Sequence, residues 1–146
     1  MGDEGNKAVV RRFVEEVQSD HRMDVVDELF SPEFLDHAVP LGMAPQRGSG
    51  HFKQFYAGML AAFPDVRFTI VDQVAEGDKV ATIKTARGTH RGEFMGVRPT
   101  GREIELPVID VFRVAEGKLV EHWGAWDNLR LLQQIGAAPA RGQSGA

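Results

Sequence analysis

The chain has 146 residues, a formal net charge of −4 and a hydrophobic content of 42%, which fits one globular domain with one core. Its acidic balance and the lack of a basic patch argue against non-specific binding of nucleic acids or anionic membranes. Cysteine is absent, which excludes disulfides, thiolate metal ligands and thiol nucleophiles. The polar start MGDEGNK and the lack of a long apolar run predict a cytoplasmic protein.

The N-terminal half shows helical periodicity. Apolar residues recur at helical spacing over Asn6–Gln18, Asp24–Phe30 and Gly50–Phe63. A small strand is expected to start within Phe34–His37. The segment Ala38–Ser49 contains Gly and Pro and predicts a long loop, which in a compact domain is often a functional lid or rim.

The C-terminal half is rich in Val, Ile, Thr and aromatic residues, which favour strands. Turn signals at Glu76–Asp78 and Glu116–Gly117 predict hairpins. A short helix is expected at Asn128–Ile135, so that residues 1–136 form one domain and residues 137–146 a disordered tail. The expected strands are Val66–Ala75, Lys79–His90, Arg102–Val114 and Lys118–Trp126.

Helices followed by long hairpin strands indicate an α+β domain, with the helices packed on one face of a curved antiparallel β-sheet. If such a sheet curls around the helices, it encloses a cone whose mouth is a natural pocket for a small molecule. The expected ligand is therefore a small molecule rather than a nucleic acid or a membrane.

The stretch EHWGAWD, residues 121–127, carries the strongest chemical signal of the chain. It places two Trp, one His and two carboxylates within seven positions. A carboxylate beside an aromatic wall loses solvation of its charged form, which raises its pKa toward neutrality and makes it a useful general base. The pattern predicts acid–base chemistry in an aromatic pocket.

Several blocks of this sequence resemble the SnoaL-like polyketide cyclases of the NTF2-like superfamily. They are FSPEFLDHAVP, AAFPDVRFTIVDQVAEGDKV, GTHRGEFMGVRPTGR and DVFRVAEGKLVEHWGAWD. The resemblance implies an NTF2-like cone and a homodimer or homotetramer. It also implies a cofactor-independent enzyme that closes a ring of an anthracycline-type polyketide methyl ester by intramolecular aldol condensation.

The resemblance places the general acid/base at Asp127, near the end of the last long strand. The same residue is also well placed as the N-cap of the helix that follows. Three residues compete for the second polar position in the pocket: His122, Asp110 and His37. Asp110 could equally be a hydrogen-bonded core residue. His122 could face solvent or another subunit, because the sequence does not fix which parity of the strand Lys118–Trp126 lines the pocket. His37, just before the long loop, could stand at the pocket mouth or be an ordinary surface histidine.

Aromatic and apolar residues are the candidates for substrate binding, with simple core packing as their alternative. Phe94 and Met95 fall in the connection Arg91–Gly101, where apolar residues suggest a lid, a rim or a dimer contact. No HxH, HxxxH or HExxH spacing occurs, so no metal site is expected. A hydroxylase, another NTF2-like isomerase or hydrolase, and a non-catalytic binding domain remain alternative functions. The candidate substrate-binding residues are Phe34, Tyr56, Phe94, Met95, Trp123 and Trp126.

Overall fold

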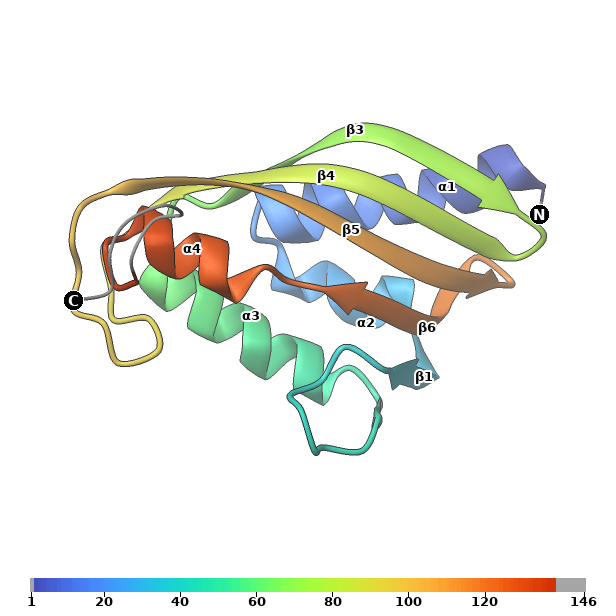
Figure 1. Ribbon diagram of the computed structural model, residues 1–146. Coiled ribbons are helices and arrows are strands. Elements are labelled where there is room, and N and C mark those ends of the chain that lie inside the picture. The colour runs from blue at the N-terminus through green and yellow to red at the C-terminus, as the bar shows by residue number, and fades with distance from the viewer. Residues whose placement is uncertain (1, 139–146) are drawn as a thin grey trace.

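The computed structural model describes residues 2–138 (Figure 1). An α-helix and a π-helix form one continuous N-terminal rod, and two short helical turns follow before the first strand. No helix within the described residues has the length and apolar character needed to cross a membrane. The helices are α1 (Asp3–Arg12), η1 (Phe13–Ser19), η2 (Met23–Val25), α2 (Val26–Leu29), α3 (Gly50–Ala62) and α4 (Asn128–Gln134).

One sheet of six strands runs in the order β2-β1-β6-β5-β4-β3. All neighbours pair antiparallel except β1 and β6, which are parallel. The parallel pair is the one exception to the predicted antiparallel arrangement, and it arises because the chain leaves β1 through α3 before it builds the hairpins. The strands are β1 (Phe30–Asp36), β2 (Gln46–Arg47), β3 (Arg67–Glu76), β4 (Lys79–Thr89), β5 (Glu103–Ala115) and β6 (Lys118–Ala125).

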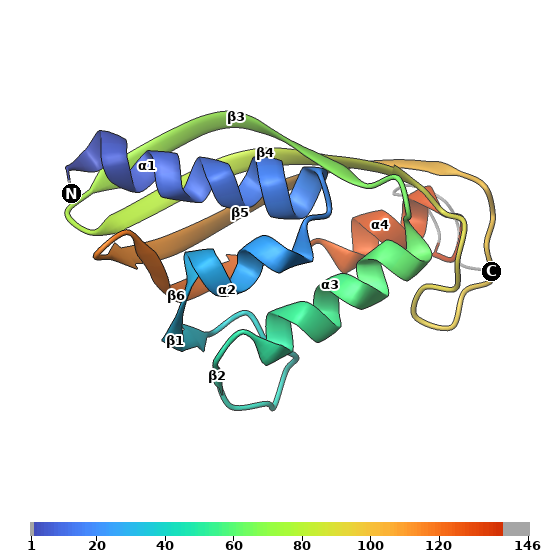
Figure 2. The same ribbon diagram turned by 180° about the vertical axis from the view of Figure 1, so that it is seen from behind.

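The long strands β3, β4 and β5 arch over the helices (Figure 1). Seen from behind, α1 runs along β3 and β4, while α2 and α3 lie below the arch (Figure 2). This arrangement confirms the predicted α+β class, with helices packed on one face of a curved sheet.

Strict alternation in β5 shows how the sequence builds the inner face. Its even-numbered side chains from Ile104 to Val114 are buried, and most of the odd-numbered ones are exposed. A two-residue period of this kind places one set of side chains against the helices and the other toward solvent. Asp110 is a member of the buried set, so the strand carries a carboxylate into the apolar interior.

Aromatic rings join the helices to the sheet. The ring of Phe13 in η1 lies 5.6 Å from Phe30, 5.3 Å from Phe52 and 5.1 Å from Phe112, measured between centroids. Tilted and edge-on pairs at such distances stabilise beyond their buried area, by about 0.5–1.5 kcal/mol each. The rod α1–η1 is therefore fixed against β1, α3 and β5 around one residue.

Several element boundaries differ from the predicted ones: β1 begins four residues before Phe34, and β2 lies within the predicted loop Ala38–Ser49, where it pairs with the end of β1. The first helix begins at Asp3 rather than Asn6, and Asn6 is a buried helical residue. Phe30 opens β1 instead of ending a helix, since its backbone is already extended at φ −93° and ψ 135° two residues before Pro32. At the other end, the Ala137 amide donates to the Leu132 carbonyl at 2.8 Å. The rest of the predicted tail, 139–146, lies outside the described residues.

Candidate active site

Five polar side chains cross the apolar interior as one hydrogen-bonded series, here named the inner polar chain. Asp36 Oδ1 accepts from His122 Nδ1 at 2.9 Å, and His122 Nε2 lies 3.4 Å from Asp110 Oδ2. The Lys84 ammonium donates to the same Asp110 oxygen at 2.8 Å and to Gln18 Oε1 at 2.9 Å. The series is Asp36, His122, Asp110, Lys84 and Gln18.

Strand register brings these residues together. Asp36 of β1 pairs with His122 of β6, and His122 in turn pairs with Phe112 of β5. On the other side of β5, Asp110 pairs with Thr82, two positions before Lys84 on the same face of β4. Side chains one step apart diagonally are within reach of a long lysine. The chain of contacts therefore follows from the order β1-β6-β5-β4.

The carboxyl and the imidazole shift each other's protonation. Burial works to raise the pKa of Asp110, but Lys84 and the hydrogen bond with His122 outweigh it and hold that pKa below its ordinary value. Burial works to lower the pKa of His122, but hydrogen bonds and charge from Asp110 and Asp36 outweigh it and raise that pKa. An ionised carboxylate beside a protonated imidazole is a general base next to a general acid.

Two unpaired polar atoms lie on the same side of the sheet as this pair. Within residues 2–138, the buried atoms Asp110 Oδ1 and Trp126 Nε1 have no hydrogen-bond partner. Trp126 follows β6 two positions after Gly124, which itself pairs with Asp110. A buried polar atom without a partner is costly, so this acceptor and this donor are candidates for contact with a ligand.

Gly124 packs closely against the same pair of residues. A Cβ atom at this position would lie 3.1 Å from the Asp110 Cβ and 3.3 Å from His122 Nε2. The His122 side chain is 17% exposed, so solvent reaches the imidazole while Asp110 stays almost fully covered. The geometry thus combines a buried carboxylate with an imidazole that solvent reaches.

The structure places His37 and Trp123 on the opposite, outer face of the sheet. Their rings stack at 5.0 Å with an interplanar angle of 3°, and Lys79 Nζ lies 5.3 Å from the Trp123 ring. His37 Nε2 also lies 2.6 Å from the Glu121 carboxylate. Hydrogen bonds from His37 and Arg113 hold the pKa of Glu121 below its ordinary value. These residues form a separate surface cluster.

Asp127 is exposed and caps α4. Its carboxylate accepts the backbone N–H of Arg130 at 2.9 Å, as an N-cap does for the first turn of a helix. The alternative role that the sequence left open for Asp127 is thus present in the structure. Its predicted catalytic role remains a prediction.

The remaining candidates occupy three different environments. Phe34 and Tyr56 are both 1% exposed, and the Tyr56 hydroxyl donates to the Gln18 carbonyl. Burial raises the pKa of Tyr56. Phe94 packs on Phe63 with centroids 5.5 Å apart at the C-terminal end of α3, whereas Met95 is 63% exposed.

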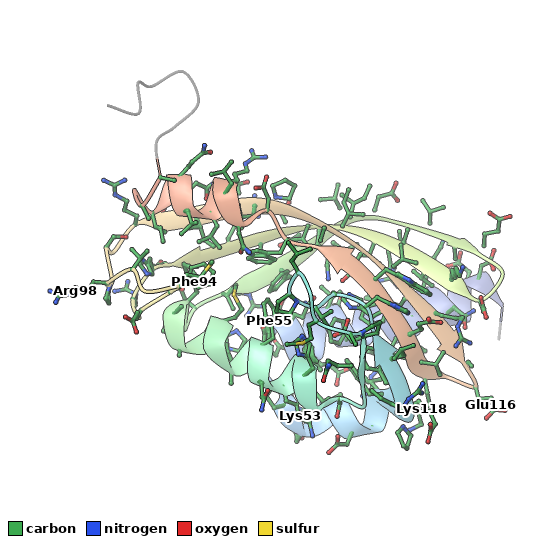
Figure 3. All side chains as sticks on the ribbon, turned by 60° about the horizontal axis from the view of Figure 1, so that its bottom comes forward. Lys53, Phe55, Phe94, Arg98, Glu116 and Lys118 are labelled. Carbon is green, nitrogen blue, oxygen red and sulfur yellow. The ribbon has the colours of Figure 1, made fainter. Side chains whose placement is uncertain are left out.

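Figure 3 shows this connection between β4 and β5 beside α3, with Phe94 turned toward the body of the protein and Arg98 away from it. The connection is anchored at the helix end, because the amides of Arg91 and Gly92 both donate to the Ala62 carbonyl, at 2.9 and 3.0 Å. Gly92 is required there, since a Cβ atom would lie 1.9 Å from the Ala61 carbonyl oxygen.

Lys84, Asp36 and Gln18 were not singled out by sequence analysis. A signal for Lys84 exists: in the alternating series Val80, Thr82, Lys84, Ala86 it occupies an inward position among small and apolar residues. Asp36 directly precedes His37 at the end of β1, so their side chains point to opposite faces of the sheet. The sequence does not show which of the two points inward. Gln18 carries no local signal, since its contact depends on how η1 packs against the sheet.

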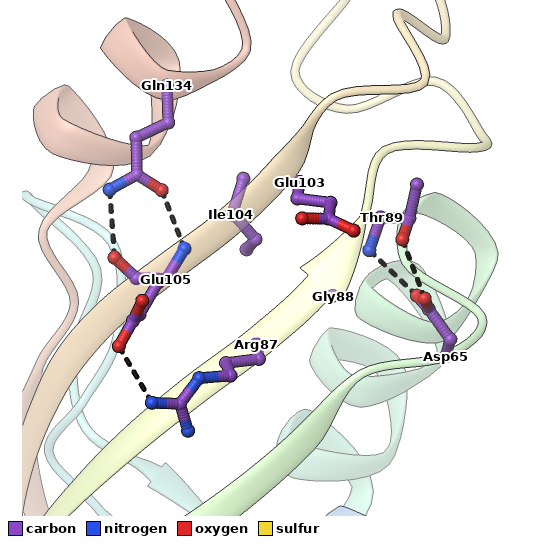
Figure 4. A pocket seen from close by; sticks show the side chains of 8 residues that line it. All are labelled: Asp65, Arg87, Gly88, Thr89, Glu103, Ile104, Glu105 and Gln134. Atoms are coloured by element: carbon purple, nitrogen blue, oxygen red, sulfur yellow. Dashed lines mark hydrogen bonds and ion pairs between the residues drawn. The ribbon is translucent and has the colours of Figure 1, made fainter.

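A surface pocket of about 480 Å³ lies apart from the inner polar chain (Figure 4). The polar side chains in it are largely paired with one another: Arg87 with Glu105 at 2.8 Å, and Asp65 with the Thr89 hydroxyl at 2.7 Å. Gln134 donates to and accepts from the Glu105 backbone, at 2.8 Å each. These contacts tie α4 and the loop before β3 to the sheet, so this pocket is structural in character.

Known proteins share this fold. AclR, a proposed hydroxylase from Streptomyces galilaeus, matches with a TM-score of 0.84 and 29% identity, over 95% of this chain and 85% of AclR. IdmH, a proposed polyketide cyclase from Streptomyces antibioticus, matches with a TM-score of 0.80 and 35% identity, over 90% of this chain and 98% of IdmH.

The sequence comparisons agree with the structural ones. Nogalonic acid methyl ester cyclase from Streptomyces nogalater is 28% identical over 116 residues, which cover 79% of this chain and 86% of that protein. The model of the SnoaL-like polyketide cyclase family matches residues 8–135. The chain therefore belongs to the SnoaL-like polyketide cyclase family, with the NTF2-like fold.

Proposed function

We propose that the protein is a cofactor-independent cyclase that closes a ring of an anthracycline-type polyketide methyl ester by intramolecular aldol condensation. The observation that carries the proposal is the His122–Asp110 pair, an imidazole and a carboxylate 3.4 Å apart on the inner face of the sheet, with the imidazole partly exposed. The similarity to nogalonic acid methyl ester cyclase supports the substrate class.

The proposed reaction needs one proton removed and one proton delivered. Asp110 Oδ1, which has no partner within residues 2–138, takes a proton from a carbon that lies between two carbonyl groups. The resulting enolate carbon attacks a ketone carbon of the same molecule, which forms the new carbon–carbon bond and leaves an alkoxide. His122 Nε2 protonates that oxygen, and the proton on Asp110 then returns to His122.

The raised pKa of His122 favours the protonated imidazole, and the lowered pKa of Asp110 favours the ionised carboxylate. A carboxylate with a lowered pKa is a weak base, but the proton it removes is already acidified by two carbonyl groups. One positioned base contributes about 10²–10⁴-fold, and holding both reacting carbons together contributes more. The demands on the pair are therefore modest.

The surroundings of the pair fit a polar aromatic ligand. The free Trp126 indole N–H can donate to a carbonyl of the substrate, which would satisfy the buried donor. The partly exposed imidazole of His122 is where substrate atoms would reach the pair. Phe55 of α3 is 50% exposed (Figure 3). Leu41 and Met43, in the connection between β1 and α3, are also exposed and add apolar surface.

Incubation of the purified protein with nogalonic acid methyl ester tests the proposal, with products followed by mass-resolved chromatography. Cyclisation predicts a product of unchanged mass and new retention time, lost in Asp110→Asn. A gain of one oxygen would replace the proposal with hydroxylation. Binding without turnover of this probe would contradict the cyclase assignment and favour a binding domain.

We further propose that the protein is a homodimer built on the outer face of the sheet. Four aliphatic side chains on β3, β4 and β5 are exposed there by 38–63%, and Ile83 and Ile109 pair across neighbouring strands. Exposed apolar clusters of this kind mark association surfaces. Ile109→Lys should shift the mass measured by light scattering to that of a monomer; an unchanged mass would place the interface elsewhere. The four residues are Val71, Val74, Ile83 and Ile109.

A further inference from the structure

Lys84 is a fully buried lysine in the middle of a strand. Its side chain is 0% exposed, and its ammonium group lies 5.7 Å from the Phe13 ring and 5.5 Å from the Phe68 ring. Lysine is almost never fully buried unless it is paired, because the charged group loses its hydration. The described structure gives its ammonium two polar partners: Gln18 at 2.9 Å and Asp110 at 2.8 Å.

The contact with Asp110 is to one oxygen only. Asp110 Oδ2 receives both Lys84 and, more loosely, His122, while Oδ1 has no partner within residues 2–138. A carboxylate rotates about its last torsion with little cost, so its two oxygens exchange unless one of them is held. The 2.8 Å contact from a charged donor holds Oδ2, and it thereby fixes which oxygen remains available.

We propose that Lys84 is a positioning residue for the reaction proposed above: its ammonium group clamps Asp110 Oδ2 and so presents the ionised Oδ1 to the substrate. The inference rests on the proposed function for its chemical purpose. Its structural part, that Lys84 keeps Asp110 ionised and oriented, stands on the contacts alone.

The groups that face this pair come from every element around it. His122 of β6 contacts Asp110 directly, and Asp36 of β1 contacts His122 on its far side. Gln18 of η1 and the rings of Phe13 and Phe68 carry no titrating charge, and Tyr56 of α3 reaches only the Gln18 carbonyl. Lys84 is the one lysine or arginine in contact with Asp110 among the described residues, and burial opposes its effect by raising the pKa of Asp110.

Carbon-detected NMR on the full chain tests the clamp without any substrate. In the wild type, the Asp110 carboxyl should titrate below the ordinary Asp value, and the Lys84 Nζ signal should respond with the same midpoint. In Lys84→Met the Asp110 midpoint should rise by about 1–3 pH units, the range that an adjacent opposite charge produces. Lys84→Arg, which retains the charge, should return the midpoint toward that of the wild type.

An Asp110 midpoint that is the same in Lys84→Met as in the wild type would overturn the proposal. If Lys84→Met does not fold, the wild-type titration decides alone: a midpoint at or above the ordinary Asp value, or an Nζ signal insensitive to it, overturns the clamp.

A measurement of turnover separates the clamp by Lys84 from the proposed cyclase function. With nogalonic acid methyl ester as probe, Lys84→Met should move the acidic limb of the kcat/KM profile to higher pH and lower kcat more than it changes KM. A wild type that fails to cyclise the probe would refute the proposed function and leave the NMR outcome standing. A normal profile in Lys84→Met would refute the clamp and leave the cyclase assignment intact.

Discussion

Gly124 lies directly opposite Asp110 in the pairing of β6 with β5, and its missing side chain lets β6 lie close against the Asp110–His122 pair. A methyl group there would lie 3.1 Å from the Asp110 Cβ and 3.3 Å from His122 Nε2, so these side chains would have to shift. The position therefore offers a way to disturb the geometry of the pair without replacing either proton-transferring group.

Gly124→Ala is expected to lower kcat/KM by at least about tenfold, because the added Cβ would lie 3.1 Å from the Asp110 Cβ and 3.3 Å from His122 Nε2 and would displace the pair. The free energy of unfolding should fall by about 1 kcal/mol, the usual cost of a single substitution. Steady-state kinetics and urea denaturation measure the two quantities. Gly58→Ala on α3 is the matched control, since a Cβ there meets nothing within 4 Å. It should leave kinetics unchanged and stabilise the helix by about 0.5–1 kcal/mol. Equal kinetics in both variants would remove Gly124 from the site.

Asp127→Ala should destabilise the protein by about 1 kcal/mol through loss of the cap on α4, whereas Asp127→Asn should be nearly neutral because Asn caps equally well. Urea denaturation of the three proteins measures the difference. If Asp127→Ala were as stable as the wild type, the hydrogen bond to the Arg130 amide would contribute nothing in solution.

His122 should make folding stability depend on pH. Its pKa is raised above 6.5 in the folded protein, so the stabilisation that it contributes is fully present below pH 6.5 and is lost as pH rises through the folded pKa. Asp110 acts in the opposite direction: its contribution is present above pH 3.8 and is lost as pH falls through its lowered pKa.

The free energy of unfolding, measured by urea denaturation at several pH values, should therefore decline as the pH rises from 6.5 through the raised pKa of His122. His122→Asn should flatten that decline and leave the acidic side in place. A decline that persists unchanged in the variant would assign the effect to another group.

His37→Ala is expected to leave cyclisation unchanged, because the imidazole of His37 stacks on Trp123 on the outer face of the sheet. His122→Asn should lower kcat by about 10²–10⁴-fold, the usual contribution of a positioned acid or base. Parallel kinetics on the two variants discriminate between the histidines. A loss of turnover in His37→Ala that exceeds the loss in His122→Asn would move the site to the outer face.

The architecture was accessible from sequence because local patterns agree with the global fold. The alternation of β5 and the turn signals at Gly77 and Gly117, which both adopt positive φ angles, predicted the hairpins. The pairing of β1 with β6 was not accessible, since a parallel partner far away in the chain leaves no mark on either strand.

The direction in which the β6 side chains point explains why the sequence could not decide between His122 and His37 as the site histidine. Leu119 and His122 both point inward although they are three positions apart, because the register shifts between the pairs Val114–Leu119 and Arg113–Glu121. This bulge reverses the parity after Val120. Regular alternation from Leu119 would have placed Glu121 and Trp123 inside, so only the three-dimensional pairing identifies His122 as the inward residue.

The carboxylates were ranked by resemblance, which favoured Asp127, while burial favours Asp110. Asp127 is exposed at the helix cap, and Asp110 is 5% exposed beside Lys84 and His122. The partner that allows Asp110 to be buried as a charge is a lysine on β4, and this contact depends on the register of two strands. Sequence periodicity could place each residue on the inner face but could not show that they meet.

The most direct test of the account compares Asp110→Asn with Asp127→Asn in cyclisation of nogalonic acid methyl ester, at matched concentration and with the fold of each checked by circular dichroism. If Asp110 is the base, Asp110→Asn should lower kcat by about 10²–10⁴-fold, and the kcat of Asp127→Asn should stay within about threefold of the wild type. A wild-type rate in Asp110→Asn, together with loss of turnover in Asp127→Asn, would contradict the account and return the base to the residue that the family resemblance favoured.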